Sequence, residues 1–406
     1  MPINFTAPQN RACFKQPPIS VRVLHVFKSD YHQSKGGIEN AIRHMTIASA
    51  RLGAQNTILC IGDNTLSKHY NEYKGNDAGL QQNAATRVIV CPATLSYDSL
   101  AFSRIMVGRF KSLLREHDLV HYHFPFPQQD MMHLCFKPQI PSVLTYHSDI
   151  VRQRILYEFY KPLLQAFLSR VDAIVATSEN YMLSSRILRR FKKRAWTIPL
   201  GLDEAYYPRA DPWALQQWEA RVGRDFFLFI GVLRYYKGLD ILLQAASKTA
   251  QRFVIAGIGP MQDYLRSVAR RLGLQNVVFS GSISETDKAA LFHLCRALVL
   301  PSHMRSEAFG LALVEGAMFG RPLISCEIGT GTSFINQHKY TGLVVRRSDP
   351  EALLNAVHTL ARNPQLCETY GKNARKRYLE RFTADIQARQ YLALYGRLLG
   401  LSQDGL

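Results

Sequence analysis

Short apolar runs alternate with longer amphipathic segments along most of the chain. Each short run is rich in β-branched and aromatic residues and ends at turn residues, which predicts a buried strand. The segments between the runs carry apolar residues at helical spacing. The strands expected in the first half are Val21–Phe27, Asn56–Ile61, Arg87–Cys91, Leu119–Phe124, Ser142–His147 and Ala173–Thr177. Alternating strands and helices predict a parallel sheet with right-handed crossovers.

The alternation stops at Ile198–Pro208, whose two prolines and glycine predict a linker, and then begins again. Further strands are expected at Phe226–Gly231, Arg252–Ala256, Val277–Ser280, Ala297–Pro301 and Pro322–Cys326. The sequence therefore predicts an α/β protein with two Rossmann-like parallel-sheet domains that face a central cleft. We expect a mobile leader over residues 1–20, a first domain over 21–203, a second over 204–380 and a terminal helix within 381–406.

The charge balance predicts a polyanionic partner. The chain has 50 basic and 31 acidic residues, a net charge of +19. Nucleic acid, an anionic membrane surface and phosphorylated substrates all fit such an excess, but no nucleic-acid-binding module is recognisable. The densest basic run, residues 186–194, includes Ile187, Leu188 and Phe191. A basic helix of this kind can lie on an anionic bilayer, and a solvated helix face is the alternative.

Cysteine usage and hydropathy favour a cytoplasmic protein. The seven cysteines are scattered, and no C-x-x-C occurs, so neither a disulfide framework nor a cysteine metal site is expected. The N-terminus lacks the apolar stretch of a secretory signal, and no apolar run reaches the ~18–20 residues of a spanning helix. We expect any membrane contact to be peripheral, on the inner face of the cytoplasmic membrane.

The strongest candidate for chemistry is the segment Ser302–Ala317, which follows an expected strand. It contains Glu307, a glycine-led helix start at Gly310 and Leu311, and Glu315. Exposed N–H groups at a helix start suit a phosphate, and carboxylates can accept hydrogen bonds from sugar hydroxyls. The alternative is structural: one acidic residue that stabilises the helix dipole and one solvated glutamate.

Two cations and two glycine pairs lie at other strand ends. Arg234 and Lys237 follow the first strand of the second half, and together they suit a diphosphate, although loop cations are common in a basic protein. Gly36 and Gly37 permit close backbone approach before the first helix, or form only a flexible turn. The pair in Ala256–Pro260 lacks the third glycine of a dinucleotide site, so no NAD binding is expected.

Histidines gather at the ends of two strands. His121 and His123 share one strand face, and no third metal ligand is indicated there, so no metal is expected. His147 ends its strand at the proposed cleft and is the better functional candidate. A satisfied core histidine is the alternative.

The order of these motifs resembles family 4 of the retaining glycosyltransferases. The matching motifs are G-G-I-E, T-Y-H-S-D, R-x-x-K-G, A-G-x-G-P, F-x-G and E-x7-E, spread from about Val21 to about Gly400. The resemblance implies the GT-B fold, with the last helix crossing back to the first domain. It also implies transfer of a sugar from a nucleotide diphosphate with retention of anomeric configuration, without a cofactor or metal.

The resemblance implies a role for each candidate residue. Arg234 and Lys237 would contact the donor diphosphate, which Gly36 and Gly37 would approach from the other domain. Glu315 would hold the ribose, backbone around Gly281 would border the base, and Glu307 and His147 would meet the donor sugar. Phe309, Gly310 and Leu311 would lie beside the sugar and phosphate.

One loop narrows the expected substrate. Glu327–Thr332 replaces the family's commoner Gly-Gly-x-x-Glu pattern and is similar to mannosyl- and rhamnosyltransferases of lipopolysaccharide O-chain assembly. GDP-mannose or GDP-rhamnose is therefore the first expectation for the donor, and a glycan or polyprenyl-diphosphate-linked glycan for the acceptor. A nucleotide-sugar epimerase of the same architecture and a non-catalytic sugar-nucleotide-binding assembly protein remain alternatives.

Overall fold

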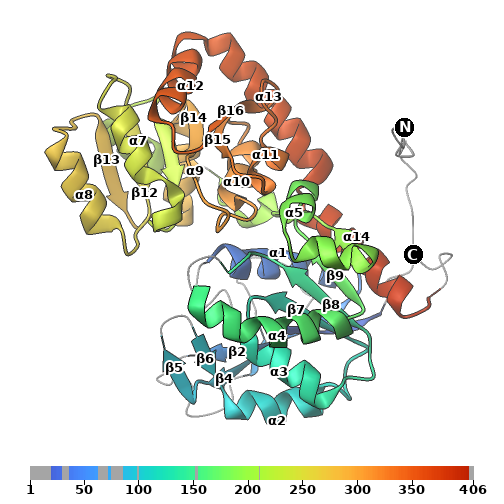
Figure 1. The fold of residues 1–406 in the computed structure, drawn as a ribbon. Coiled ribbons are helices and arrows are strands. Elements are labelled where there is room, and N and C mark those ends of the chain that lie inside the picture. Colours follow the sequence, from blue (N-terminus) through green and yellow to red (C-terminus); the bar gives the residue numbers. More distant parts are fainter. Residues whose placement is uncertain are drawn as a thin grey trace, which may run out of the picture.

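Two parallel sheets, each covered by helices, form the body of the protein (Figure 1). The computed structural model describes residues 20–29, 36–62, 72–74, 86–97, 100–150, 154–209 and 211–401. The expected leader therefore lies outside the described residues, apart from Ser20. Within the described ranges, no helix has both the length and the apolar character needed to cross a membrane.

The first sheet has eight strands and is parallel except at one edge. Strand β1 lies near its middle, with β2 on one side and β7 on the other. In spatial order the strands are β10 (Ala195–Thr197), β9 (Ala173–Ala176), β8 (Ser142–Tyr146), β7 (Leu119–Phe124), β1 (Arg22–Val26), β2 (Gln55–Gly62), β4 (Arg87–Pro92) and β3 (Glu72–Lys74). A separate antiparallel hairpin joins β5 (Leu95–Tyr97) and β6 (Leu100–Phe102).

The second sheet has six parallel strands in the order of a Rossmann fold. The order is β13 (Val277–Gly281), β12 (Phe253–Ala256), β11 (Phe227–Ile230), β14 (Ala297–Leu300), β15 (Leu323–Glu327) and β16 (Gly342–Arg346). The strand order reverses between β11 and β14. Ligands of open parallel sheets bind at such a reversal, outside the carboxyl ends of the strands.

Helices cover both sheets. In the first domain, α2, α3 and α4 bury apolar side chains on one face, and α1 and α14 cover the opposite face. In the second domain, α6 packs on α9, and α7 packs on α8 and α12. The α-helices are α1 (Gly37–Arg51), α2 (Arg104–Leu113), α3 (Pro127–Phe136), α4 (Arg154–Arg170), α5 (Glu179–Ser184), α6 (Pro212–Val222), α7 (Leu239–Ala246), α8 (Gln262–Arg271), α9 (Glu285–Leu294), α10 (Leu311–Met318), α11 (Gly331–Ile335), α12 (Pro350–Arg362), α13 (Pro364–Arg381) and α14 (Ala384–Leu398).

The chain passes between the domains twice, and the two passages lie side by side. Leu202 in the linker forms a parallel bridge with Thr383, just before α14. A side chain at Gly201 would meet the carbonyl oxygen of Thr383 at 2.3 Å, so the close approach requires glycine. After this crossing, α14 packs on α1 of the first domain, as Figure 1 shows in red. The C-terminal helix therefore crosses back to the first domain, as the resemblance implies.

The structure departs from the expected elements in two ways. The basic run forms a 3-10 helix, Leu188–Arg194, with a kink at Phe191, rather than a regular helix. The Arg194 guanidinium donates to the carbonyls of Leu168, Ser169 and Val171, which anchors the turn to the end of α4. The sequence pattern also missed β3, β5, β6, β10 and β16, which are short or only partly buried.

Candidate active site

The candidate motifs of the second domain lie on two neighbouring loops. One loop follows β11 and includes a 3-10 turn, Tyr235–Lys237, and the other follows β14 and ends at Gly310. Because β11 and β14 are adjacent and parallel, their carboxyl ends place both loops at the reversal of strand order. Gly238, which ends the first loop, has φ +67, and a side chain there would meet the Pro301 carbonyl oxygen at 2.2 Å. The two loops therefore touch through this glycine.

A buried ion pair joins the two loops. The Lys237 ammonium lies 2.5 Å from Glu307 Oε2, which also accepts a hydrogen bond of 2.9 Å from Ser302 Oγ. Both side chains are nearly buried, with 12% and 10% exposed. Burial acts to lower the pKa of Lys237, but the Glu307 carboxylate outweighs it, so the pKa of Lys237 is raised. The ammonium therefore stays charged and holds the Glu307 carboxylate in place.

Further positive charge lies beside this pair. Arg234 is exposed, and its charge acts on the pKa of Lys237, so the two cations are close. Gly310 has φ +93 and starts α10 without a capping side chain, so the first N–H groups of α10, beginning at Leu311, lack a cap. The ring of Phe309 is buried in the core against Phe382. Its backbone, rather than its ring, is what the site can use.

Glu315 is held in place from two sides. Its Oε1 accepts hydrogen bonds from Tyr207 Oη at 2.9 Å and from Lys288 Nζ at 3.0 Å. Burial raises the pKa of the Tyr207 phenol well above its usual value, and the Glu315 carboxylate raises it further. The phenol therefore stays protonated and donates to Glu315, so both of these hydrogen bonds go to Oε1.

The glycine pair of the first domain connects to Glu315 through Tyr207. Gly36 precedes α1 and Gly37 begins it, and a side chain at Gly37 would have no atom within 4 Å. Three residues after Gly36, the buried Glu39 carboxylate accepts a hydrogen bond of 2.6 Å from Ser29. One turn further on, the His44 ring stacks on Tyr207 with centroids 6.1 Å apart. Tyr207 therefore contacts both the middle of α1, through His44, and Glu315 of α10.

Direct contacts also join the domains beside the Glu307 loop. Arg305 donates to Asp149 Oδ2 at 3.2 Å and to Ser184 Oγ at 2.9 Å, both in the first domain. Its guanidinium also lies 5.3 Å from the centre of the Tyr181 ring. Asp149 is two residues after His147, and Arg305 is two residues before Glu307. The ion pair therefore joins the loop that follows His147 to the loop that carries Glu307.

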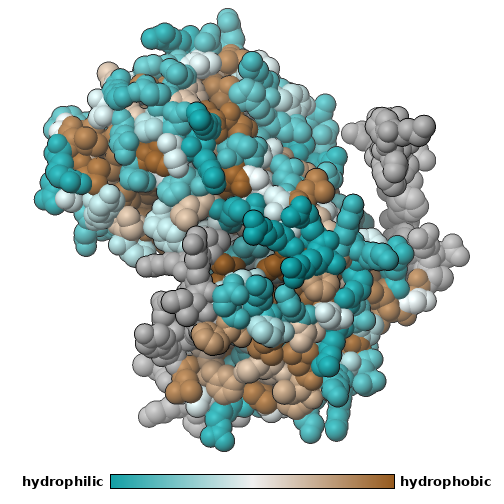
Figure 2. Space-filling model, viewed as in Figure 1, coloured by the Kyte–Doolittle hydropathy of each residue, from teal (hydrophilic) through white to brown (hydrophobic). Residues whose placement is uncertain are grey.

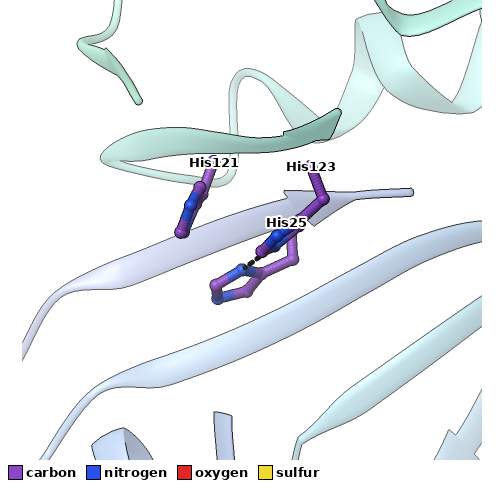
Figure 3. A group of neighbouring side chains, drawn as sticks. All are labelled: His25, His121 and His123. Atoms are coloured by element: carbon purple, nitrogen blue, oxygen red, sulfur yellow. Dashed lines mark hydrogen bonds between the residues drawn. The ribbon is translucent and has the colours of Figure 1, made fainter. Parts of the chain in front are cut away.

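The structure changes the interpretation of the histidines. His25 of β1 joins His121 and His123, and the three side chains each offer a nitrogen within 4.8 Å of the others (Figure 3). The sequence indicated no third ligand beside His121 and His123, but the structure brings His25 to them from a neighbouring strand far away in sequence. Both ring nitrogens of each histidine are nevertheless hydrogen-bonded. His25 bonds to Asn56 and His123, and His123 bonds to His25 and His147. His121 bonds to Tyr395 and Thr145. The cluster is arranged as a hydrogen-bonded network.

The remaining glycines differ in how closely other atoms approach them. Gly257 and Gly259 face the Gly231–Leu233 backbone, where side chains would meet main-chain atoms at 2.1 and 2.6 Å. Tight packing of two loops accounts for this pair. Gly281 ends β13 at φ +76, and a side chain there would have no atom within 4 Å. Gly281 is therefore not held against neighbouring atoms as Gly257 and Gly259 are.

Several residues of the site escaped sequence reasoning. Tyr207, Lys288, Arg305, Asp149 and His25 make the contacts that orient the expected residues. Only Asp149 and Arg305 lie inside motifs named in the sequence analysis. No residue next to either one in the sequence indicates that the two form an ion pair. A long-range partner such as Lys288 for Glu315 carries no local signal, because the pairing arises only when α9 packs beside α10.

Two family models match the chain over its two halves. The description "Glycosyltransferase Family 4" matches residues 35–206, and "Glycosyl transferases group 1" matches residues 214–377. The chain is 43% identical to O-antigen chain mannosyltransferase C of Escherichia coli over 93% of this chain and 99% of that protein. It is 44% identical to D-rhamnosyltransferase WbpZ of Pseudomonas aeruginosa over 90% of this chain and 93% of that protein.

Solved structures agree on the fold. Sucrose-phosphate synthase from Thermosynechococcus elongatus matches 94% of this chain and all of that one, with a TM-score of 0.74 and 22% identity. Anabaena HepE in complex with UDP matches 93% of this chain and all of that one, with a TM-score of 0.71 and 20% identity. The two sheets, their crossing helix and these relatives lead to one conclusion: the chain belongs to family 4 of the glycosyltransferases and is a glycosyltransferase of GT-B fold.

Proposed function

We propose that the chain transfers mannose or D-rhamnose, with retention, from a GDP-sugar to a lipid-linked glycan during cell-surface polysaccharide synthesis. One observation carries the proposal: the buried Lys237–Glu307 pair lies at the strand-order reversal, beside the uncapped start of α10. Two relatives named for mannosyl and D-rhamnosyl transfer, at 43% and 44% identity, support the choice of sugar.

The proposed site binds the diphosphate by charge and by backbone. Lys237 and Arg234 supply two cations, and the N–H groups at the start of α10 supply aligned dipoles that favour an anion. Gly36 and Gly37, across the cleft, allow a phosphate to approach the backbone at the start of α1. Glu315 Oε2 accepts from the ribose hydroxyls, and the open space around Gly281 takes the base.

The chemistry assigned to the site is a same-face displacement. The acceptor hydroxyl attacks the anomeric carbon on the face from which the diphosphate leaves. A donor phosphate oxygen takes the hydroxyl proton as the bond between sugar and phosphate breaks. Lys237, Arg234 and the α10 dipole stabilise the negative charge that builds on the departing diphosphate, which is the largest contribution a preorganised site can make. Glu307 and His147 orient the sugar through its hydroxyls. No metal and no cofactor take part in this proposal.

The proposed acceptor places the enzyme on an anionic membrane. Exposed cations gather at the 3-10 helix Leu188–Arg194 and just before it. They are Arg186, Arg189, Arg190, Lys192 and Lys193. The charge of Arg190 acts on the pKa of Tyr157 in α4, so this helix and α4 are neighbours, and Phe159 of α4 is 81% exposed. The surface near α5, from which this segment continues, is strongly hydrophilic in Figure 2. Exposed cations, with an exposed aromatic ring on the neighbouring helix, suit the cytoplasmic leaflet.

Sedimentation with vesicles tests the membrane contact. Replacing Arg189, Lys192 and Lys193 by Gln should weaken binding to phosphatidylglycerol vesicles about a hundredfold, at about 1 kcal/mol per cation. The same three-charge change in α8, at Arg266, Arg270 and Arg271, is the control and should leave binding unaltered. Equal weakening by both triple variants would show that net charge, not this surface, attracts the protein.

Product analysis tests the proposed reaction. The protein is first screened by thermal shift against GDP-, UDP-, ADP- and dTDP-sugars, and a ligand at about 100 times its dissociation constant should stabilise it by about 2.7 kcal/mol. Transfer from GDP-mannose or GDP-rhamnose to a polyprenyl-diphosphate glycan, with an α-linked product from an α-linked donor, is the expected result. Conversion of the donor to another nucleotide sugar without acceptor would instead identify an epimerase.

A further inference from the structure

One face of the first sheet changes from apolar to polar toward the carboxyl ends of its strands. On the face covered by α1 and α14, Val21 and Val23 of the β1 segment are followed by His25. The neighbouring strand continues from Leu119 to His121 and His123. Side chains two residues apart share a face, and β1 pairs His25 with His121. Polar groups therefore line the end of this face that is nearer the cleft.

Four of these polar side chains form a row across consecutive strands. Asn56 of β2 is hydrogen-bonded to His25 of β1, with Oδ1 and Nε2 3.1 Å apart. His25 Nδ1 lies 3.3 Å from His123 Nε2 of β7, the dashed contact in Figure 3. His123 Nδ1 lies 3.1 Å from Nε2 of His147, which directly follows β8. Successive ring centroids are 5.5 and 5.4 Å apart, with planes tilted by 22° and 25°, so the nitrogens point at each other edge to edge.

Asn56 sets the direction of this row. Its Nδ2 donates to the Thr46 carbonyl oxygen at 2.8 Å, and a carbonyl oxygen can only accept. The amide orientation is therefore fixed, and Oδ1 faces His25. Because an amide oxygen also only accepts, His25 Nε2 must hold a proton.

Each hydrogen bond of the row has the same donor-to-acceptor direction, because each imidazole is neutral and has one donor and one acceptor nitrogen. Burial lowers the pKa of His25 to about 4 and of His147 to about 3, and lowers that of His123 well below its usual value. A neutral imidazole protonated at Nε2 has a bare Nδ1 that accepts. His25 Nδ1 therefore accepts from His123 Nε2, and His123 Nδ1 accepts from His147 Nε2. The last ring is left with an unprotonated Nδ1.

That last nitrogen has no partner where the domains meet. His147 Nδ1 is buried and forms no hydrogen bond in the part of the chain that the structure describes. Two residues later, Asp149 is ion-paired to Arg305 of the Glu307 loop. A buried acceptor without a donor is destabilising. A ligand held between the His147 and Glu307 loops could supply that donor.

We propose that Asn56, His25 and His123 are positioning residues that hold His147 in one tautomer, so that its Nδ1 accepts a hydrogen bond from a hydroxyl of the donor sugar. The inference rests on the proposed function, in which His147 meets that sugar. It adds a chemical requirement: the group recognised here must donate a proton, as a sugar hydroxyl does. A deoxygenated carbon at the same position leaves Nδ1 unsatisfied.

The test compares donors and variants together. Transfer is measured with GDP-mannose and its monodeoxy analogues, for wild type and for His147→Ala, His123→Leu and His123→Asn. Wild type should prefer the parent donor to one analogue about tenfold in kcat/KM. His147→Ala and His123→Leu should both lose preference for that same hydroxyl. His123→Asn should keep it, since the Asn oxygen stands near the place of Nδ1 and accepts from His147.

His121→Leu is the matched control for packing. His121 stacks on His123 with centroids 4.3 Å apart, but it bonds to Tyr395 and Thr145, outside the row. It should lower stability and keep the hydroxyl preference. A second measurement needs no variant that disturbs the sheet: ¹⁵N spectra of histidine-labelled wild type, with the His147 signals assigned through His147→Ala. They should show His147 protonated at Nε2 and bare at Nδ1.

Each outcome decides between the proposals. Preference lost in both His147→Ala and His123→Leu, with the expected nitrogen signals, supports the row. Preference lost only in His147→Ala, or a proton found on Nδ1, overturns the row and leaves the proposed function standing. No effect of His147→Ala overturns both the role of His147 and the row. Stoichiometric metal in the purified protein, removable together with the hydroxyl preference, would show that the imidazoles are ligands and would overturn the row.

Discussion

At the scale of single residues, the site depends on groups held by partners from distant parts of the chain. Lys237 would be a solvated loop cation without Glu307, yet the pair is nearly buried at 2.5 Å. Glu315 is likewise held by hydrogen bonds from Tyr207 and Lys288. Removing one member of a buried pair leaves the other uncompensated, so variants that keep shape are more informative than truncations.

Glu307→Gln should reduce transfer about a hundredfold, the size of effect seen when one preorganised polar group is lost from an active site. The amide keeps the volume of the carboxylate and can still accept from Ser302. It no longer neutralises Lys237, so the ammonium remains free to bind the diphosphate. GDP affinity by calorimetry should therefore be unchanged or higher. Undiminished turnover in the variant would refute the assigned role.

Gly37→Ala separates a binding role from a structural one. A side chain at Gly37 has open space, and Ala in a helix is more stable than Gly by up to about 1 kcal/mol. The variant should fold at least as well as wild type, but its methyl group should hinder the phosphate and raise the donor KM about tenfold. Gly108→Ala, in the exposed part of α2, also meets open space and should leave KM unchanged. Identical KM in both variants would exclude Gly37 from the donor site.

The sequence could identify residues that lie in local motifs, but not their partners from distant parts of the chain. Glu307, Glu315 and Lys237 lie in local motifs next to predicted strands, so their position beyond the carboxyl ends of those strands was predictable. Their partners were not, because Tyr207 sits in a linker and Lys288 in an ordinary helix until packing joins them. His25 is a further case. It was part of an expected strand, but its hydrogen-bond partner His123 lies 98 residues away in the sequence.

At the scale of elements, buried parallel strands were predictable and edge strands were not. A strand such as β12 is apolar on both faces, which stands out in the sequence. The edge strand β10 is only three residues long and partly exposed. The basic run was expected to be a regular helix, but anchoring of Arg194 to the end of α4 accompanies a kinked 3-10 helix instead.

The loop from Ser302 to Gly310 is one of the elements that join the domains, through Arg305. Arg305→Ala should lower kcat at saturating donor about tenfold while changing donor affinity less, because Glu307 would no longer be held opposite His147. Scattering with donor present should give a larger radius of gyration than for wild type. The control is Arg224→Ala, which removes an exposed ion pair with Glu219 before β11 and should change neither quantity. A drop in donor affinity without any loss of kcat would contradict this assignment.

At the scale of the whole molecule, the two domains are connected by the linker, the crossing before α14, the Arg305 contacts and the packing of α5 on α11. We expect them to close further on the donor, by rotation about the linker Ile198–Pro208, because the proposed ligand touches both. The parallel-sheet architecture was predictable from the alternation of patterns. How closely the domains meet was not, since that depends on pairs such as Asp149–Arg305.

Buried neutral histidines should make the whole fold sensitive to mild acid. Burial lowers the pKa of His44 and His147 to about 3, and that of His25 and His133 to about 4. Below pH ~6.5 the unfolded chain takes up protons that the folded chain cannot, so the free energy of unfolding falls as pH drops toward 4. Urea unfolding at pH 7 and pH 5 measures this loss. His44→Asn should lose less than wild type, and an equal loss would contradict burial as its cause.

The central claim is that one sugar diphosphate is bound between the domains, and a crystal structure with GDP-mannose tests it most directly. We predict the diphosphate within hydrogen-bonding distance of Lys237, Arg234 and the N–H groups at the start of α10, with the sugar between Glu307 and His147. A diphosphate bound elsewhere, or held by the second domain with its sugar turned away from the first, would contradict the account.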